Sequence, residues 1–303
     1  NPHGCIMTLV PKKGLAAQRE KELEEKLEAY RSSLSEEQLD AMVEKTKALE
    51  AYQEAGEDPK ALECIPMLKR SDIKREAAKI INEELTVDDS LFLYHDVCTN
   101  GIGYVDLMFK TDSIAPEQIP YLGLLKSVLG YVDTENYTYG ELFNEINANT
   151  GGINCGVEVF DRADSTEEFQ AMFSVRGKAL YTKMDFLFKM IGEILNSSKL
   201  EDTKRLYEIV ASVKSRAQVN LTGAGHSTAV LRAAAYSSPM AAFQDEMAGI
   251  GYYQFIEKLE KDFEQRKEET VEELCKLMKK ILRPENFMIS YTGESCLLYT
   301  SPS

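Results

Sequence analysis

The sequence predicts an α+β fold in which helices cover one face of an antiparallel sheet, with a long helical hairpin in front of it. Three observations predict this arrangement. Residues 16–63 carry sparse apolar positions at helical spacing. The segments after them run in the order strand, strand, helix, helix, strand, strand, and a block of helices then ends in one more strand. With 303 residues and 44% hydrophobic composition, the chain can bury a substantial core.

The first elements are a short strand and an acidic helical segment. Residues 6–10 alternate as a strand does, and Pro11 ends them before a turn. Residues 16–63 contain 14 Asp and Glu against 7 Lys and Arg, and Ser35–Gln38 has the capping-box pattern that starts a second helix. This acidic charge either attracts cationic peptides or is a solvated helix face, which is the commoner case. The apolar positions of the thin seam between the two helices are Leu23, Leu27, Tyr30, Leu39, Met42, Val43 and Leu49.

The main unit is expected to open with a β-hairpin. Its turn is Thr99-Asn100-Gly101, where the Asn-Gly pair supplies the positive φ angles of a tight connection. Thr150-Gly151-Gly152 breaks the chain between two helices and the next pair of strands. The elements expected here, in order, are strands at 90–97 and 102–109, helices at 119–132 and 139–147, and strands at 153–160 and 169–177.

The rest of the chain is predicted to be helical, apart from a closing strand. An amphipathic helix starts near Met184 and should cover one face of the sheet, because its apolar residues recur every three or four positions. Residues 203–282 continue as helices, and a strand follows at 287–291. The breaks expected among these helices are Gly223-Ala224-Gly225, Ser238-Pro239 and Gly249-Ile250-Gly251.

Composition and charge exclude several classes of protein. The formal net charge is −15, so the surface would repel a phosphate backbone, and we expect no nucleic-acid partner. No apolar run approaches the ~18 residues that span a bilayer, and we expect no membrane partner. The six cysteines are scattered without a Cys-x-x-Cys pair, which indicates free thiols in a reducing compartment. We therefore expect a cytoplasmic protein, from a bacterium.

The sequence contains no recognisable catalytic or metal-binding motif. Zinc hydrolases hold two histidines four residues apart on one helix face, whereas His3, His95 and His226 are each about ninety or more residues apart. A site assembled from these three in space remains the open alternative to ordinary polar histidines. Gly225-His226-Ser227 is interpreted as a helix start that Ser227 caps, because no nucleophile elbow surrounds the serine.

Cysteine chemistry and phosphate binding are equally unsupported. Cys98 and Cys155 lie in predicted strands with no neighbouring cation to lower a thiol pKa, so both are interpreted as buried, inert cysteines. Gly151-Gly152 lacks the remaining glycine of a dinucleotide fingerprint, and no Walker lysine follows a glycine cluster. We assign no catalytic, cofactor-binding or metal-ligating residue to this chain.

A series of short strings nevertheless resembles, in order, the central part of presequence proteases, a branch of the insulinase (pitrilysin) family. The resemblance extends over nearly the whole chain. The strings are Asn1-Pro2-His3, Leu9-Val10-Pro11-Lys12, Leu34-Ser35-Glu36-Glu37, Ile65-Pro66 with Leu68, Ser71-Asp72-Ile73, Thr99-Asn100-Gly101-Ile102, Thr134-Glu135-Asn136-Tyr137, Thr150-Gly151-Gly152-Ile153, Gly177-Lys178-Ala179-Leu180 and Gly225-His226-Ser227.

The resemblance implies a clamshell of four α+β units in two halves, joined by a helical hairpin around a chamber for unfolded peptides. It implies that residues 1–11 are the last strand of the second unit, 12–72 the hairpin linker and 73–295 the third unit. The family's zinc ligands, in an inverted His-x-x-Glu-His motif, belong to the first unit, and its substrate-orienting Arg and Tyr belong to the fourth. None of these has a counterpart here, and Asn149 replaces a His that many relatives carry before Thr-Gly-Gly.

Residues 296–303 look like the in-frame translation of a sequencing-library adapter, and we expect them to be an artefact. The function expected is therefore that of a noncatalytic central fragment, hinge and chamber wall, of a zinc-dependent metalloendopeptidase that degrades oligopeptides. Its partners would be unfolded oligopeptides and the N- and C-terminal units of the same chain. Zinc would be the cofactor of the full-length protein, with none bound by this fragment. The alternative is a noncatalytic clamshell homologue that acts as a binding or assembly subunit.

Overall fold

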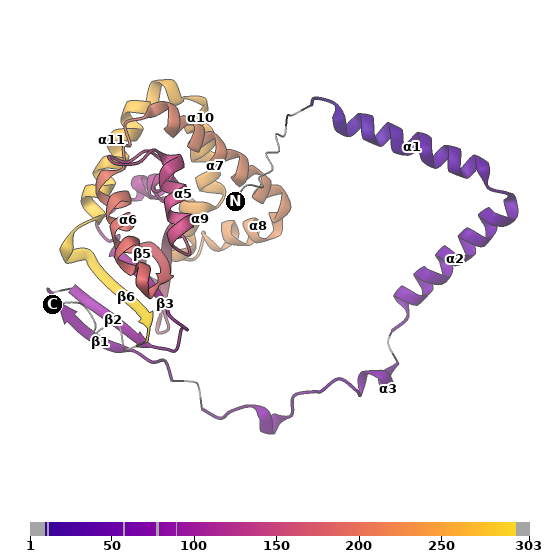
Figure 1. Cartoon of the computed structure of the whole chain (residues 1–303), viewed down its shortest axis with the longest axis horizontal. Coiled ribbons are helices and arrows are strands. Elements are labelled where there is room, and N and C mark those ends of the chain that lie inside the picture. Colours follow the sequence, from indigo (N-terminus) through magenta and orange to yellow (C-terminus); the bar gives the residue numbers. More distant parts are fainter. Residues whose placement is uncertain (1–9, 11, 57, 77–78, 89, 295–303) are drawn as a thin grey trace, which may run out of the picture. The chain divides into compact units, whose positions relative to one another are not determined.

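The chain divides into two units, residues 1–78 and residues 79–303 (Figure 1). The computed structural model describes residues 10, 12–56, 58–76, 79–88 and 90–294. The strand predicted at 6–10 lies, except for its last residue, outside the described part, and so does the tail at 296–303. Each unit is described by itself below.

The first unit is helical. Its elements are α1 (Leu15–Ser33), α2 (Glu36–Glu54), the short α3 (Pro59–Leu62) and the 3-10 turn η1 (Arg70–Asp72). The predicted capping box is confirmed at the start of α2. The backbone N–H of Gln38 donates to Ser35 Oγ at 3.3 Å, and the N–H of Ser35 donates to Gln38 Oε1 at 3.0 Å.

The apolar seam of these two helices is not buried in the described structure. No residue of α1 or α2 is buried. Leu27 is 57% exposed and Val43 is 50% exposed. The two helices therefore have no core of their own, because a stripe of this width needs a second apolar surface to cover it.

The second unit is built on a six-stranded sheet with the order β1-β2-β6-β3-β5-β4. Every neighbouring pair is antiparallel except β2 and β6, which are parallel. The predicted α+β class is confirmed, and the antiparallel arrangement holds for all pairs but that one. The strands are β1 (Glu83–Val87), β2 (Ser90–Asp96), β3 (Ile102–Lys110), β4 (Ile153–Arg162), β5 (Ser165–Leu180) and β6 (Phe287–Gly293).

The β-hairpin expected at Thr99–Gly101 is wrong, although the turn itself is present. Asn100 and Gly101 have φ angles of 54° and 82°, as the Asn-Gly pair predicts. The strands on either side do not pair with each other, because β6 lies between β2 and β3. Glu294, just after β6, fixes the connection, since its Oε1 accepts the backbone N–H groups of Thr99 at 3.2 Å and Asn100 at 3.1 Å.

β1 is a strand that the sequence did not predict. It pairs with β2 from Val87 opposite Ser90 to Glu83 opposite Tyr94. Its five residues include two glutamates, and only Leu85 among them is even partly buried. The alternation of such a short edge strand is too weak to distinguish it from a loop.

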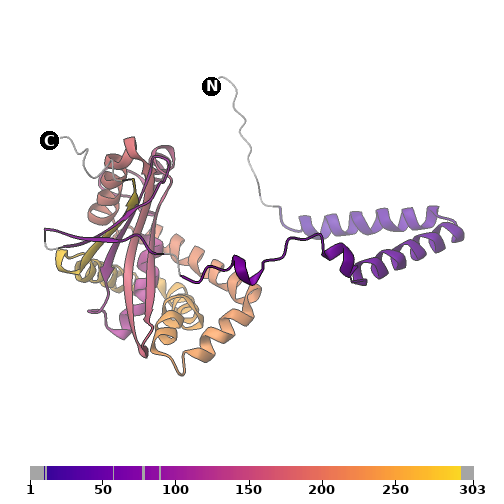
Figure 2. The same cartoon turned by 90° about the horizontal axis from the view of Figure 1, so that it is seen from below.

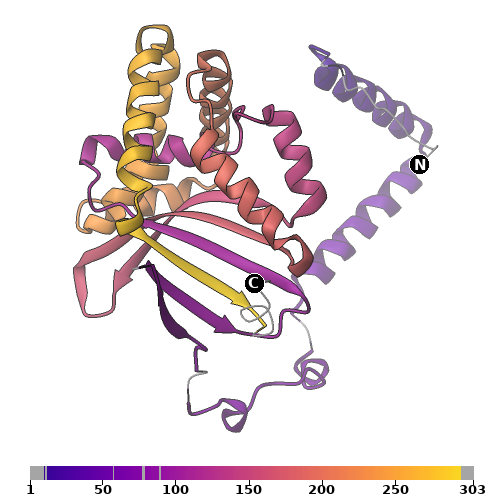
Figure 3. The same cartoon turned by 60° about the vertical axis from the view of Figure 1, so that its left-hand side comes forward.

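Helices gather on one face of this sheet (Figures 2 and 3). They pack on a core that includes Phe173 and Val175 from β5 and Leu187 and Ile194 from α6, all almost completely buried. The helices are α4 (Ile119–Val128), α5 (Tyr139–Asn149), α6 (Met184–Ser197), α7 (Thr203–Gly223), α8 (Gly225–Ala234), α9 (Pro239–Ala248), α10 (Ile250–Lys261) and α11 (Phe263–Ile281), with 3-10 turns η2 (Pro116–Gln118), η3 (Tyr181–Lys183) and η4 (Pro284–Asn286).

The predicted breaks between the late helices are confirmed at Gly223–Gly225, Ser238–Pro239 and Gly249–Gly251. An additional break at Asp262 separates α10 from α11. The capping role expected for Ser227 is wrong. It lies inside the first turn of α8, which begins at Gly225 without a side-chain cap. None of the helices in the described part of the chain is both long and apolar enough to cross a membrane.

Candidate functional site on the open face of the sheet

The face of the sheet opposite the helices carries a set of polar side chains. Along β3 the side chains of Val105 and Leu107 enter the core, so those of Tyr104 and Asp106 project from the other face. The same alternation on β5 buries Val175 and leaves Arg176 and Lys178 exposed.

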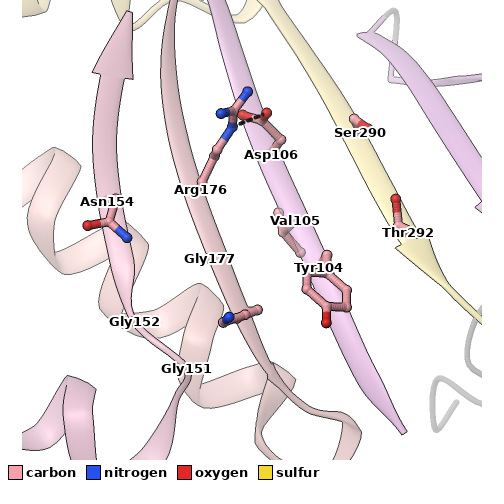
Figure 4. Close-up of a pocket in the computed structure, with 11 residues that line it drawn as sticks. Tyr104, Val105, Asp106, Gly151, Gly152, Asn154, Arg176, Gly177, Ser290 and Thr292 are labelled. Carbon is pink, nitrogen blue, oxygen red and sulfur yellow. Dashed lines mark hydrogen bonds and ion pairs between the residues drawn. The ribbon is translucent and has the colours of Figure 1, made fainter. Parts of the chain in front are cut away.

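The strand register aligns these residues in rows across four strands. One row pairs Ser290 of β6 with Asp106, Asp106 with Arg176, and Arg176 with Asn154 of β4. The next row pairs Thr292 with Tyr104 and Tyr104 with Lys178. These residues line a shallow depression of about 430 Å³ (Figure 4). The depression therefore offers charged groups, hydroxyls and an amide side by side on an uncovered surface.

Arg176 is the central charge of this surface. Its Nε donates to Asp106 Oδ2 at 2.7 Å, and its Nη1 lies 3.0 Å from Glu158 Oε1 on β4. The hydrogen bond to Asp106 is the main reason why the pKa of Arg176 is raised. One guanidinium thus ties three strands together and keeps its remaining donors toward solvent.

Asp106 is the partly buried partner. Burial raises the pKa of Asp106, and this effect outweighs the hydrogen bond and charge of Arg176, which lower it. Its second oxygen, Oδ1, is buried without a hydrogen-bond partner among the residues that the structure describes. An unsatisfied acceptor at the floor of a depression is suited to receive a donor from a ligand or a water molecule.

The Gly151-Gly152 pair forms one wall of the depression (Figure 4). The N–H of Gly151 donates to the carbonyl of Lys178 at 2.7 Å. A Cβ at position 151 would lie 2.7 Å from Lys178 Cγ, and Gly152 has a φ of 105°. These glycines therefore allow the chain to pass close beside Lys178.

The described residues contain no group of three or more His, Cys, Asp or Glu side chains that could hold a metal ion. His95 lies on β2 with Nδ1 2.7 Å from the carbonyl of Ile81 and Nε2 3.1 Å from Ser290 Oγ. His226 is exposed on α8, and His3 lies outside the described part. The donor set in the described chain therefore does not fit a zinc ion.

The two cysteines singled out from the sequence differ. Burial raises the pKa of Cys155 to about 12, which confirms it as an inert thiol at neutral pH. The prediction for Cys98 is wrong, because β2 already ends at Asp96 and leaves Cys98 exposed in the following loop. Asn149 is a helix-terminal residue of α5, with its amide oxygen accepting from Lys183 Nζ at 2.9 Å.

Sequence reasoning missed the surface residues Tyr104, Asp106, Glu158 and Arg176. A signal for them was present. Tyr104 and Asp106 of β3 and Arg176 and Lys178 of β5 alternate with apolar or small residues, which indicates that one face of this part of the sheet is not covered by helices. What the sequence does not contain is the register that places Asp106 and Glu158, from two different strands, on either side of Arg176.

Comparison with known proteins identifies the family to which this chain belongs. A family model for the region associated with peptidases of family M16, subfamily C, matches residues 9–259. The chain therefore belongs to this peptidase-associated family, and the resemblance to the presequence-protease branch that the sequence predicted is confirmed.

Individual relatives come from bacteria and eukaryotes. Protein HypA of Clostridium perfringens is 35% identical over 294 residues, which cover 97% of this chain and 30% of that protein. Presequence protease 1 of Arabidopsis thaliana, a chloroplastic and mitochondrial protein, is 26% identical over 97% of this chain and 27% of its own length. The mitochondrial presequence protease of Yarrowia lipolytica is 28% identical over 78% of this chain and 23% of its own length. The chain thus spans less than a third of these relatives.

A solved structure is similar in fold. The crystal structure of a conserved protein from Enterococcus faecalis V583 matches with a TM-score of 0.50 and 14% sequence identity, over 73% of this chain and 52% of that chain. This likeness concerns the arrangement of strands and helices alone.

Proposed function

We propose that this chain forms the hinge and part of the chamber wall of a zinc-dependent metalloendopeptidase that degrades oligopeptides, and that it takes no part in bond cleavage. The residues from 79 onward form the wall, and α1 and α2 form the hinge. The partners are unfolded oligopeptides and the N- and C-terminal units of the same protein. Nucleic acid and membranes are not partners, and the protein works in the cytoplasm.

The observation that carries this proposal is the polar open face of the sheet. A row of groups from Ser290 to Asn154 crosses the strands, with the solvated guanidinium of Arg176 at its centre. Such a surface can form hydrogen bonds with peptide backbones of any sequence, because backbone N–H and C=O groups are the same in all of them. Its serine–histidine contact, Ser290 Oγ with His95 Nε2 at 3.1 Å, has no carboxylate behind it, because His95 Nδ1 lies 2.7 Å from the carbonyl of Ile81. The surface is therefore suited to holding a peptide.

The relatives support the proposal that this chain is one part of a larger peptidase. Several relatives are named presequence proteases, and their aligned segments make up 23% to 28% of their length. The proposed zinc site belongs to a part of the complete protein that corresponds to nothing in this chain. The His, Cys, Asp and Glu side chains of the described residues form no group of three that could hold a metal ion, so no step of hydrolysis is assigned to them.

The test is a pair of arginine substitutions in the complete protein. Arg176→Gln removes the central cation of the open face, and KM for an unfolded peptide should rise about fivefold, the equivalent of one lost hydrogen bond worth ~1 kcal/mol. The turnover number kcat should stay unchanged, because the group contacts substrate and transition state equally.

Arg162→Gln is the matched control. Arg162 also bridges two carboxylates, Asp164 at 3.0 Å and Glu168 at 3.1 Å, but it does so at the turn between β4 and β5. Its kinetics should equal those of the unmodified protein. Equal effects of both substitutions, or a loss confined to kcat in Arg176→Gln, would contradict a peptide-binding role of the open face.

A further inference from the structure

The outer edge of β4 borders a groove that the open-face site does not use. β4 is the last strand in the sheet order, and in the described chain only β5 pairs with it. Seven consecutive residues, from Gly152 to Glu158, line a groove of about 460 Å³. The facing wall comes from the end of α4, the residues after it and α5, including Lys126, Tyr131 and Phe143.

This edge lacks the devices by which proteins usually protect edge strands. Between Ile153 and Val157 there is no proline and no charged residue, and the only register shift in β4 lies further on, between Asp161 and Arg162. Gly156, in the middle of the segment, has no side chain to obstruct an approaching backbone. Seven residues of extended chain reach about 23 Å at ~3.3 Å per residue, which is enough to pair with a short extended peptide.

Two cations line the groove without an ion pair. Lys126 on α4 and Arg216 on α7 make no hydrogen bond or salt bridge with any residue of the described chain. Burial lowers the pKa of Lys126, and the attraction of Glu158 offsets this only in part, which means that the ammonium group is partly desolvated. Glu158 is itself paired with Arg176 at 3.0 Å and shares its single charge between that pair and Lys126.

A buried hydroxyl points to the same place. Ser127 and Arg216 line both this groove and a smaller adjoining pocket of about 260 Å³, which Tyr252 of α10 also lines. Tyr252 is 5% exposed, and its Oη has no hydrogen-bond partner of good geometry in the described chain. Burial raises the pKa of Tyr252, while Ser127 and Arg216 lower it, so both of these groups lie near its hydroxyl.

The hydroxyl of Ser127 donates to the carbonyl of Gly123 at 3.3 Å, within its own helix. A buried tyrosine normally finds an acceptor for its hydroxyl. At this junction the hydroxyl of Ser127 lies beside that of Tyr252, and the exposed guanidinium of Arg216 has no anionic partner in the described chain.

We propose that the β4 groove binds an extended peptide as an added strand and that the C-terminal carboxylate of the peptide lies at the junction of Arg216, Tyr252 and Ser127, near Lys126. This rests on the proposed function in one respect, the peptide nature of the ligand. The C-terminal carboxylate is the one anion that every oligopeptide carries whatever its sequence. A carboxylate accepts from a guanidinium and a hydroxyl together, so it can bind Arg216 and Tyr252 at the same time.

The experiment measures binding to the 303-residue chain by fluorescence anisotropy and needs no hydrolysis. The probe is an N-terminally labelled eight-residue peptide of Ala, Val, Thr and Ser with a free C-terminus. The C-terminal amide of the same peptide should bind about tenfold more weakly, because one charge-assisted contact is lost. Methylation of alternate peptide nitrogens should abolish binding, because a paired strand needs its N–H groups.

Protein variants locate the carboxylate. Arg216→Gln should remove the difference in affinity between the free-acid peptide and its amide. Tyr252→Phe, which deletes only the hydroxyl, should reduce this difference in affinity severalfold. Lys204→Gln is the control, since it removes one exposed charge from the same helix, α7, away from the groove. It should leave both affinities unchanged.

Four results would overturn the inference. Equal binding of acid and amide, or an unchanged difference in Arg216→Gln, would remove the carboxylate from this junction. Tight binding of the N-methylated peptide would rule out strand pairing with β4. A C-terminal amide with an internal Asp could bind as tightly as the free-acid peptide. That result would mean that the two cations bind acidic side chains and not the C-terminal carboxylate. Because only binding is measured, inactivity of the complete protein would refute the proposed function and leave this inference standing.

Discussion

Glu193 of α6 shows how a single carboxylate fixes a loop in this fold. It is 9% exposed, and it accepts the backbone N–H of Asn136 at 3.0 Å and the Asn136 side-chain amide at 3.0 and 3.2 Å. Hydrogen bonds from Thr134 and then from Asn136 lower the pKa of Glu193. The loop that leads into α5 is therefore bound to α6 through an ionised acid.

Substitution of this residue should make stability depend less on pH. Because the pKa of Glu193 is lower in the folded state, its stabilisation is complete above the unfolded value of about 4.5 and is lost as pH falls through the folded value. Glu193→Gln should reduce the free energy of unfolding by about 1 kcal/mol at pH 7, as measured by urea denaturation. The difference from the unmodified protein should shrink toward pH 3.

Glu135→Gln, one residue before Asn136 and exposed, is the control for that measurement and should have no effect. A Glu193→Gln penalty that stays the same at pH 7 and pH 3 would show that packing, and not the ionised carboxylate, holds the loop.

At the scale of elements, the junction of α9 and α10 depends on one buried acid. Asp245 is 1% exposed and accepts the N–H groups of Ile250 at 3.0 Å and Gly251 at 3.1 Å, and Nη1 of Arg232 lies 2.6 Å from its Oδ2. A Cβ at Gly249 would overlap Asp245, and one at Gly251 would lie 2.6 Å from Glu246 Oε1. The glycines are needed because the chain folds back directly over this carboxylate.

Removal of that acid should destabilise the helical layer. Asp245→Ala leaves Arg232 and the first N–H groups of α10 without their acceptor, and the free energy of unfolding should fall by about 2–4 kcal/mol. Thermal and urea denaturation measure the change. Asp262→Ala is the matched control, because Asp262 precedes α11 without capping it, and it should cost no more than ~0.5 kcal/mol. A similar small loss in both variants would show that the Asp245 contacts do not stabilise the junction.

Most elements could be predicted because their signals are local. The periodicity of Met184, Leu187 and Ile191 on α6 and the Asn-Gly turn at residue 100 depend only on neighbours in sequence. The position of β6 between β2 and β3 is not local, because it pairs Leu91 with Met288 and Phe109 with Phe287. Alternation in β6 would look the same beside any other strand, so its neighbours had to come from the structure.

The same distinction limits what could be predicted of the site. The polar positions of β3 and β5 are visible in the sequence, but the contact of Arg176 with Asp106 and Glu158 joins residues from three strands. The β4 groove is even harder to predict from the sequence, because Lys126, Arg216 and Tyr252 lie on three different helices. None of these groups has a sequence spacing that would indicate a shared site.

At the scale of the whole molecule, each unit exposes surface that is suited to contact with other parts of a larger protein. Leu23 and Met42 on the first unit are 56% and 42% exposed, and the described helices of the second unit leave one face of its sheet uncovered (Figure 3). The proposed hinge and wall would place these surfaces against the other units and the peptide. Hydrolysis would then belong to the complete protein.

The most direct measurement is therefore zinc content and peptide hydrolysis, compared between the purified 303-residue chain and the protein from the complete reading frame. We expect no stoichiometric zinc and no cleavage for the chain alone, and about one zinc per molecule with chelator-sensitive cleavage of unfolded peptides for the complete protein. Chelator-sensitive hydrolysis by the 303-residue chain would contradict the assignment of a noncatalytic wall. A complete protein that binds peptides but neither holds zinc nor cleaves them would contradict the peptidase itself and identify a binding or assembly subunit.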